Sequence, residues 1–319
     1  MAAKFDVAVM HDFFVDRLVA APSLGRLQRL VMAKAKSGGG GLHGIGQSEI
    51  RGGNAVNLAH ALGKLGLRTL LITHSDASHL HLLRSTFEGL EVELRVKKAQ
   101  AGLTVAFEER VNVMLGDARG AGNFGPEMLD ESDWDSLRRS KVVCSVNWAA
   151  NSRGTHLLRM LRKKLGKEAT IFFDPADFRD RKREFRSVLS GIARARVADW
   201  VSMNREEGAA ASSLMGLESS TGVRLCKELA QALGVVFDLH CEEAVYTSDG
   251  RTSSEAKVKG GKPRRLTGAG DVWDAGSIYG RLAGMEGTER LRFANAASRL
   301  YLESKEPVPP SLDQVLAAV

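Results

Sequence analysis

The stretch that decides the fold is RRLTGAGDVWDAG, residues 264–276. Its residues Gly268, Ala269 and Gly270 carry little or no side chain, so their backbone N–H groups can approach an anion closely. The residues that follow have the pattern of a helix, and a helix N-terminus adds partial positive charge at the same place. The stretch therefore predicts a phosphate-binding turn at the start of a helix.

Asp271 follows this turn directly and has two interpretations. It could accept a proton from an attacking hydroxyl while the neighbouring amides stabilise charge on a transferring phosphoryl group. It could equally be the capping residue of a glycine-rich helix start. The tetrapeptide alone does not separate a catalytic base from a cap.

Outside this stretch, apolar runs of strand length alternate with amphipathic helical patterns. Strands are predicted at residues 5–10, 68–75, 141–148, 169–175, 199–204 and 235–240, and helices at 54–66, 156–166, 222–234, 272–284 and 287–304. Such alternation is typical of βαβ units. We therefore expect an α/β fold with a mostly parallel central sheet flanked by helices on both faces.

Two segments break this rhythm. Residues 91–115 alternate polar and apolar side chains without a helical stripe, which favours antiparallel strands with one wet face. Residues 17–50 are irregular and contain SGGGGLHGIGQSEI; the match of residues 39–44 to G-x-G-x-x-G does not follow a buried strand, so a substrate-side loop is favoured there. Together the segments predict a small sheet beside the main body, whose exposed edge would suit a homodimer contact.

Composition limits the classes of function. The chain has 319 residues, 44% of them hydrophobic, and a formal charge of +7, with basic residues scattered along helical faces. Solvated helix faces explain this charge better than a nucleic-acid partner. Cys144, Cys226 and Cys241 have no paired spacing, and no apolar run approaches the roughly 20 residues that span a bilayer. We expect a cytoplasmic protein with no membrane partner, no disulfide framework and no thiolate zinc site.

A second motif indicates what the phosphate-binding turn serves. Residues 51–66, RGGNAVNLAHALGKLG, place two glycines beside Asn54 and Asn57, short amides that can hold the hydroxyls of a polyol. GGNAVNLA early and TGAGDVWDAG late resemble the two signatures of the PfkB or ribokinase-like family of sugar and nucleoside kinases. The resemblance covers nearly the whole chain. It implies one ribokinase-like domain, residues 1–319, with a lid formed by residues of about 17–50 and 91–115.

The same resemblance implies roles for individual residues. Asp271 would be the catalytic base, with Gly268, Ala269 and Gly270 as the anion hole. The residues that would bind a sugar or nucleoside acceptor are Asp16, Gly52, Gly53, Asn54 and Asn57. The donor would be ATP or ADP with Mg²⁺, positioned by Asn204, Glu207 and Thr267, with Glu207 at the metal. Asp174, at a strand end, would face the site.

One departure from the family pattern puts the donor site in doubt. Where the family has Thr-x-Gly-x-x-Gly, this chain has DLHCEEA, with Asp238, His240 and Glu243 at those three positions. Carboxylates beside a polyphosphate are unfavourable, and side chains fill the room that glycines leave. Two hypotheses therefore remain. The retained Asp271 favours a kinase, and DLHCEEA favours a non-catalytic relative that binds a sugar-like ligand.

Two other clusters have alternative interpretations. His74, Asp76, His79 and His81 could be metal ligands, but their spacing and the lack of a further ligand favour polar surface. Arg264 and Arg265 could recognise a phosphate already present on the acceptor, or they could form an exposed basic turn.

Overall fold

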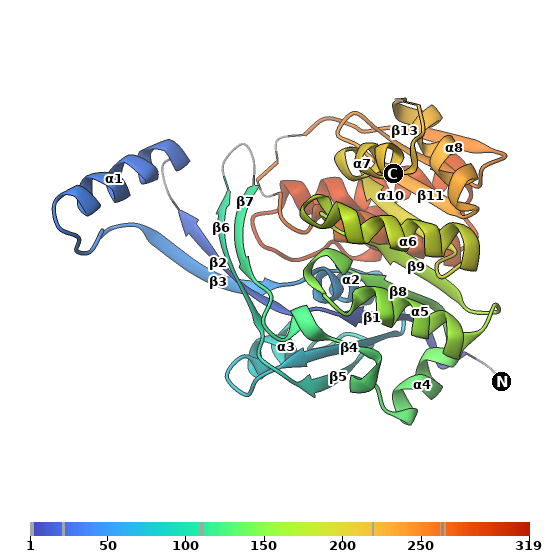
Figure 1. Cartoon of the computed structure of the whole chain (residues 1–319), viewed down its shortest axis with the longest axis horizontal. Helices are drawn as coiled ribbons and strands as arrows, with labels where there is room; N and C mark the ends of the chain where they lie inside the picture. The colour runs from blue at the N-terminus through green and yellow to red at the C-terminus, as the bar shows by residue number, and fades with distance from the viewer. Residues whose placement is uncertain (1–2, 21–22, 109–111, 219, 262, 265) are drawn as a thin grey trace.

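The computed structural model describes residues 3–20, 23–108, 112–218, 220–261, 263–264 and 266–319. Its largest feature, within these residues, is a nine-stranded sheet (Figure 1). In spatial order its strands are β13 (Ser253–Lys257), β12 (Ala244–Ser248), β11 (Val236–His240), β10 (Trp200–Asn204), β9 (Thr170–Asp174), β8 (Ser140–Val146), β1 (Phe5–His11), β4 (Thr69–Ser75) and β5 (Val92–Lys98). All neighbouring pairs from β11 to β5 are parallel, and only β12 and β13 pair antiparallel. The mostly parallel sheet predicted from the sequence is confirmed.

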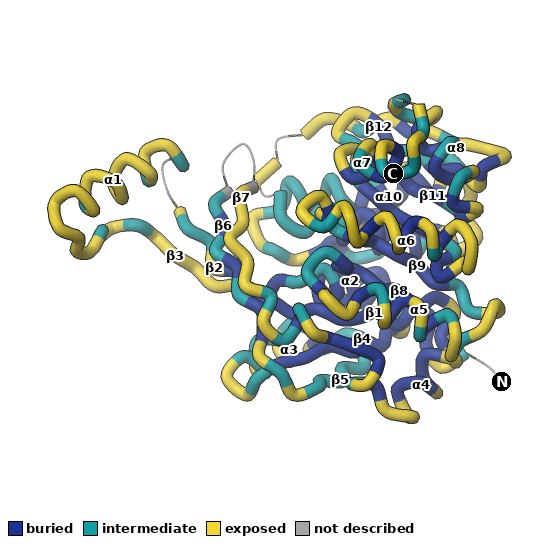
Figure 2. Tube along the Cα trace, viewed as in Figure 1, coloured by how far each residue is buried: buried dark blue, intermediate teal, exposed yellow. Residues whose placement is uncertain are grey.

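Helices cover both faces of this sheet because successive strand side chains point to opposite sides. In β1, Ala8 and Met10 belong to one hydrophobic core, and Val7 and Val9 belong to the other. The first core packs against α4 (Glu131–Arg138), α5 (Gly154–Leu165), α6 (Lys182–Ala195), α7 (Arg205–Met215) and α8 (Gly222–Leu233). The second packs against α2 (Asn54–Lys64), α9 (Ala269–Leu282), α10 (Gly287–Glu303) and the short helices α3 (Leu80–Thr86) and α11 (Leu312–Leu316). Figure 2 shows the strands buried between these layers.

A separate four-stranded sheet, which we call the lid, stands beside the main body (Figure 1). Its spatial order is β3 (Gly46–Gly52), β2 (Phe14–Ala20), β6 (Gly102–Glu108) and β7 (Asn112–Asp117). The β2–β3 connection carries α1 (Leu24–Lys36), a helix that projects away from the body and buries none of its residues. We did not expect this helix in the irregular segment 17–50.

The prediction for residues 91–115 needs correction. Only β6 and β7 of this segment lie in the lid, and β6 pairs with β2 in parallel. β5 instead pairs in parallel with β4 at the edge of the large sheet, where Val92, Leu94 and Val96 pack on the second core. An edge strand with one covered face has the same alternation as a strand of a small sheet, so the pattern could not distinguish them.

The expected polar surface around His74 is also wrong for His74 itself. This residue lies in β4 with its side chain fully buried, and neither of its ring nitrogens has a hydrogen-bond partner among the described residues. Asp76 instead accepts a hydrogen bond from His79, 2.9 Å away, and His81 is exposed. In the described ranges no group of three or more His, Cys, Asp or Glu side chains is placed to hold a metal.

Two further sequence expectations concern cysteines and membrane spans. All three cysteines are free, with Cys144 and Cys226 buried. Among the helices described in the structure, none combines the length and apolar character needed to cross a bilayer.

Burial of His74 predicts a measurable loss of stability in acid. Burial lowers the pKa of His74 from 6.5 to about 4, so below pH 6.5 the unfolded chain binds a proton that the folded chain does not. Each pH unit in this window costs about 1.4 kcal/mol. Between pH 7 and pH 5, wild type should therefore lose about 2 kcal/mol more unfolding free energy than His74→Leu, measured by urea denaturation. His81→Gln, at an exposed histidine, should follow wild type; equal losses in all three proteins would contradict the assignment.

Candidate active site

The carboxyl ends of the parallel strands gather the polar residues of the site. Asp12 follows β1, Asn147 follows β8, Asp174 ends β9 and Asn204 ends β10. In a parallel sheet these ends lie along one edge, which is where such folds bind ligands. The N-termini of α2 and α9 meet this group, because Asn57 of α2 bonds to Asp271 of α9.

Asp12 holds the start of α2 in place. Its carboxylate accepts hydrogen bonds from the backbone N–H of Asn54 at 2.8 Å and of Ala55 at 2.9 Å, two N–H groups of the first turn. The side-chain amide of Asn147 donates to the same carboxylate at 2.7 Å. Neither Asp12 nor Asn147 was predicted from the sequence as a site residue. A polar residue directly after a buried strand was the only signal available for either.

The two glycines before α2 let carboxylates approach the backbone. A Cβ on Gly52 would lie 2.1 Å from Oδ2 of Asp16, and a Cβ on Gly53 would lie 2.7 Å from the carbonyl oxygen of Asp12. Gly53 also has a φ of +100°, which side chains rarely adopt. Asp16 is buried in β2, at the root of the lid, and its carboxylate lies beside Gly52 just before α2.

A hydrogen bond between side chains joins the two sequence motifs. The amide Nδ2 of Asn57 donates to Oδ2 of Asp271 at 2.9 Å, across 214 residues of chain. Arg51, the residue before the glycine pair, donates to Oδ1 of Asn57, which directs the amide nitrogen toward Asp271. The Arg51 guanidinium also bonds to the ring of His60 at 2.7 Å and to the carbonyl of Pro307 at 2.8 Å.

Asp271 lies in the first turn of α9, directly after the predicted anion hole. Gly268 caps the helix with a φ of +85°, and Ala269 donates its N–H back to the Leu266 carbonyl at 3.3 Å. The N–H groups of Gly270 and Asp271 have no acceptor within a helix that begins here. They are therefore positioned to bind an anion at the helix N-terminus.

Burial makes the Asp271 carboxylate a stronger base than usual. Burial raises the pKa of Asp271 well above its ordinary value, the charge of Asp174 adds to this rise, and the hydrogen bond from Asn57 opposes it. Burial likewise raises the pKa of Asp174 to about 6. It also raises the pKa of Asp274, one helical turn after Asp271, although Ser202 donates a hydrogen bond of 2.6 Å to Asp274. This concentration of carboxyl groups favours protons or cations at the site.

Asn204 and Glu207 begin α7 as a capping box. Oδ1 of Asn204 accepts from the Glu207 N–H at 2.9 Å, and Oε2 of Glu207 accepts from the Asn204 N–H at 3.0 Å. Burial, followed by the charge of Asp174, raises the pKa of Glu207 to about 8. Oxygen ligands of this kind suit Mg²⁺, which proteins usually bind through one or two carboxylates together with substrate phosphates. Glu207 and Asp174 fit that mode of binding.

A cavity of about 670 Å³ opens beside the α9 turn. It is lined by Ala269, Gly270 and Trp273 of α9, by residues of α10 that include Asn295 and Ser298, and by Asn204 and His240 at strand ends. The Trp273 and His240 rings lie 5.3 Å apart, and Trp273 also donates a hydrogen bond of 2.9 Å to Asn295. The volume lies within the range of small-molecule sites.

Two of the three DLHCEEA side chains that were expected to obstruct a donor phosphate do not line this cavity. Asp238 does not face this cavity: it is fully buried, and Arg290 donates to its two carboxylate oxygens at 2.8 and 2.9 Å. Burial opposes ionisation of Asp238, but Arg290 outweighs it and the pKa lies below the ordinary value. Glu243 is exposed and paired with Arg205. Among the three substituted positions only His240 lines the cavity.

Thr267 and Arg264 lie just before the turn. The carbonyl of Thr267 accepts a hydrogen bond of 3.1 Å from Tyr301. Thr267 is not among the described residues that line the cavity. Arg264 is exposed, and its N–H donates to the Leu302 carbonyl at 2.7 Å. Arg265 lies outside the described residues.

The family model described as pfkB family carbohydrate kinase matches residues 22–314. The chain therefore belongs to the pfkB family of carbohydrate kinases and is a phosphotransferase of that family. No curated protein matches the chain.

Solved structures share the fold at low identity. Adenosine kinase from Sinorhizobium meliloti superimposes with a TM-score of 0.80 at 19% identity, covering 99% of each chain. Arabidopsis thaliana ribokinase, complexed with ribose and ATP, superimposes with a TM-score of 0.75 at 19% identity, covering 100% of this chain and 99% of the ribokinase chain. A putative ribokinase II from E. coli, in complex with ATP and Mg²⁺, gives 0.74 at 14% identity, covering 98% of each chain. These similarities confirm the ribokinase-like fold.

Because Asp238 and Arg290 form a buried ion pair, removal of one charge should lower the unfolding free energy more than removal of both. Arg290→Met leaves an uncompensated buried carboxylate and should lower the unfolding free energy by about 3 to 5 kcal/mol. The double variant Asp238→Leu/Arg290→Met removes both charges and should recover part of that loss. Urea denaturation of the two variants and wild type measures both effects. A double variant that is less stable than Arg290→Met would contradict the assignment.

Proposed function

We propose that this pfkB-family protein transfers the terminal phosphoryl group of ATP or ADP to a hydroxyl of a sugar, nucleoside or sugar phosphate. The observation that carries the proposal is the position of Asp271. This buried carboxyl lies at the first turn of α9, whose residues Ala269 and Gly270 line the cavity, and it accepts a hydrogen bond from Asn57 in the first turn of α2. A base between a phosphate site and a hydroxyl site is what phosphoryl transfer to an alcohol requires.

The acceptor side offers several polar groups for hydroxyl recognition. Asp12, Asp16 and Asn147 contribute carboxylate and amide groups, and the start of α2 contributes Asn54 and Asn57. All except the half-buried Asn54 are buried, so a bound sugar would exchange water for hydrogen bonds to groups of fixed orientation. Two of these residues, Asp12 and Asn147, are already hydrogen-bonded to each other, which fixes their positions before a ligand binds.

The donor side combines a cavity with a helix N-terminus. The cavity reaches Ala269 and Gly270, so phosphates of a bound nucleotide would lie against the N–H groups of the α9 turn. Glu207 and Asp174 would hold Mg²⁺, which neutralises charge on the phosphates of the donor. The rings of Trp273 and His240 offer an apolar wall to the rest of the nucleotide.

The proton moves to Asp271 as the acceptor oxygen attacks the phosphorus. The P–O bond to the leaving nucleotide breaks as the new P–O bond forms, and the acceptor hydroxyl proton passes to the Asp271 carboxylate. The raised pKa of Asp271 favours this transfer, while Asn57 holds the carboxylate in position. The α9 N–H groups stabilise negative charge on the transferring group.

A second candidate function is ligand binding without catalysis. His240 fills a position where the family has glycine, and Glu206 and Glu242 also line the cavity, which disfavours a polyphosphate there. In that case the chain would bind a sugar or nucleoside but no nucleotide donor.

The experiment that tests both candidates is a mass-spectrometric screen for phosphorylated products. Wild type is incubated with Mg²⁺, with ATP or ADP separately, and with a pool of pentoses, hexoses, polyols, nucleosides and sugar phosphates. A product that depends on Asp271 supports the kinase and identifies donor and acceptor together. If no product forms and calorimetry detects no binding of either nucleotide, the ligand-binding function replaces the kinase function.

Substitution of the base should abolish turnover but preserve the fold. We expect Asp271→Asn to lower kcat by at least about 100-fold, because general base catalysis contributes at least that factor. Its thermal unfolding should remain cooperative, and its affinity for the acceptor should persist in calorimetry. A variant with near wild-type kcat would remove Asp271 from the mechanism.

Loss of the Asn57 amide should change both acceptor binding and the pH profile. Asn57→Ala removes hydrogen bonds worth roughly 1 to 3 kcal/mol, so the acceptor KM should rise about 5- to 150-fold. The variant also removes a donor that favours ionised Asp271, so the pKa of Asp271 rises and the acid limb of the kcat profile moves to higher pH. The nucleotide KM serves as the internal control and should change little. An unmoved acid limb would separate Asn57 from the base.

A further inference from the structure

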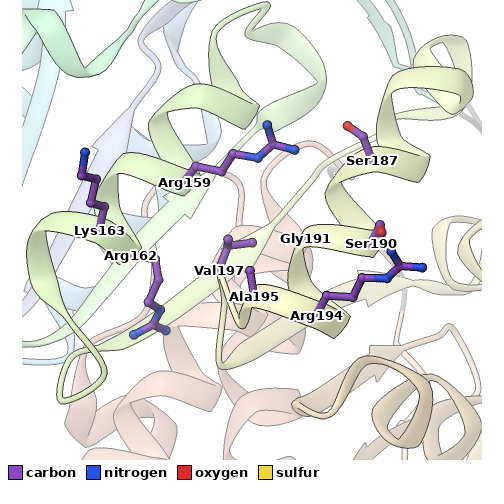
Figure 3. Close-up of a pocket in the computed structure, with 9 residues that line it drawn as sticks. All are labelled: Arg159, Arg162, Lys163, Ser187, Ser190, Gly191, Arg194, Ala195 and Val197. Carbon is purple, nitrogen blue, oxygen red and sulfur yellow. The ribbon is translucent and has the colours of Figure 1, made fainter.

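A second cavity, of about 470 Å³, lies on the surface between α5 and α6 (Figure 3). It is lined by Arg159, Arg162, Lys163, Ser187, Ser190, Gly191, Arg194, Ala195 and Val197. These residues come from the middle and the C-terminal parts of α5 and α6 and from the turn after α6. Helices that follow parallel strands run back toward the amino ends of those strands, so this cavity lies toward the opposite edge of the sheet from Asp271.

The lining of this cavity carries uncompensated positive charge. It contains four basic side chains and no acidic one. Arg162 is neutralised by an ion pair with Asp199 and also donates to the Arg196 carbonyl at 2.7 Å. The head groups of Arg159, Lys163 and Arg194 make no ion pair or hydrogen bond with the part of the chain that the structure describes. Three free cations therefore border one cavity.

Helix dipoles explain only part of this arrangement. Lys163 and Arg194 lie in the last turns of their helices, where basic residues stabilise the carbonyl ends. Arg159 lies one turn before Lys163 on the same face of α5, a like-charge spacing that destabilises a helix. In Figure 3 its guanidinium extends from α5 toward Ser187 of α6. A bound anion would relieve this repulsion.

The floor of the cavity is kept open at Gly191. A Cβ there would meet only the Val197 side chain, at ordinary contact distances of 3.6 Å and more, so packing does not require glycine. Alanine at this point would favour the helix. The glycine leaves room beside Ser190, whose hydroxyl adds a polar group to the cations.

We propose that this cavity binds a small anion with two or more phosphate charges, such as pyrophosphate or a bisphosphorylated metabolite. Arg159 and Arg194 bind phosphate oxygens through their planar donor groups, and Lys163 contributes a further positive charge from α5. The volume exceeds the needs of a single phosphate and lies in the range of small-ligand sites. The site is separate from the one proposed for phosphoryl transfer.

The test combines calorimetry with hydrogen–deuterium exchange. Inorganic pyrophosphate and a hexose bisphosphate are titrated separately at constant ionic strength. We expect at least one of them to bind and to protect peptides from residues 154–166 and 182–197. In Arg159→Gln/Arg194→Gln the dissociation constant should rise about tenfold or more, because contacts between charged groups are lost.

Two further variants sharpen the result. Arg186→Gln/Arg292→Gln removes the same charge from exposed positions outside the cavity and should bind like wild type. Gly191→Glu places a carboxylate in the cavity and should abolish binding there. Binding of the hexose bisphosphate alone would identify an organic ligand, and binding of pyrophosphate alone an inorganic one. The proposal is overturned if neither anion binds, if protection is confined to residues near 264–276, or if the first double variant binds like wild type.

Discussion

The hydrogen bond from Asn57 to Asp271 is the contact on which the site depends. It connects the first turns of α2 and α9, which lie 214 residues apart in sequence. Because each helix begins at a glycine with positive φ, both N-termini can come close to this contact without a side chain in the way. Arg51 fixes the amide from the other side. The two glycine-containing motifs are therefore parts of one structural unit.

Asp271 lies in different electrostatic surroundings from Asp238, which forms a buried ion pair with Arg290. Asp238 is as deeply buried as Asp271, yet Arg290 compensates its charge and it stays ionised. Burial and the negative charge of Asp174 raise the pKa of Asp271, and the hydrogen bond from Asn57 only opposes this rise. A carboxyl group in such surroundings gains free energy by accepting a proton or a cation. The fold thus compensates the charge of Asp238 with Arg290, whereas no ion pair compensates Asp271 within the part of the chain that the structure describes.

Much of this architecture could be predicted from the sequence because its signals are local. The turn at Gly268, the start of α2 and the alternating strands and helices each follow from short patterns. The roles of Asp12 and Asn147 could not be predicted, because they arise only when the ends of β1 and β8 meet α2. Asp238 was misjudged because its partner Arg290 lies 52 residues further along the chain.

Other differences have a similar origin in tertiary contacts. β5 looked like part of a small sheet because an edge strand of a large sheet has the same pattern of half-buried side chains. His74 looked like a surface residue because polarity alone does not reveal that Phe124 and the sheet enclose its ring.

Arg51 is the penultimate residue of β3, a lid strand, and it donates hydrogen bonds to Asn57 and to the carbonyl of Pro307 in the main body. The lid and Asp271 are therefore linked through the hydrogen bonds of Arg51 and Asn57. A rotation of β3 that displaced the guanidinium would remove the hydrogen bond that orients the Asn57 amide, and the pKa of Asp271 would then depend on the orientation of the lid. In the proposed reaction, substrate entry beneath the lid and proton transfer to Asp271 would then both depend on Arg51.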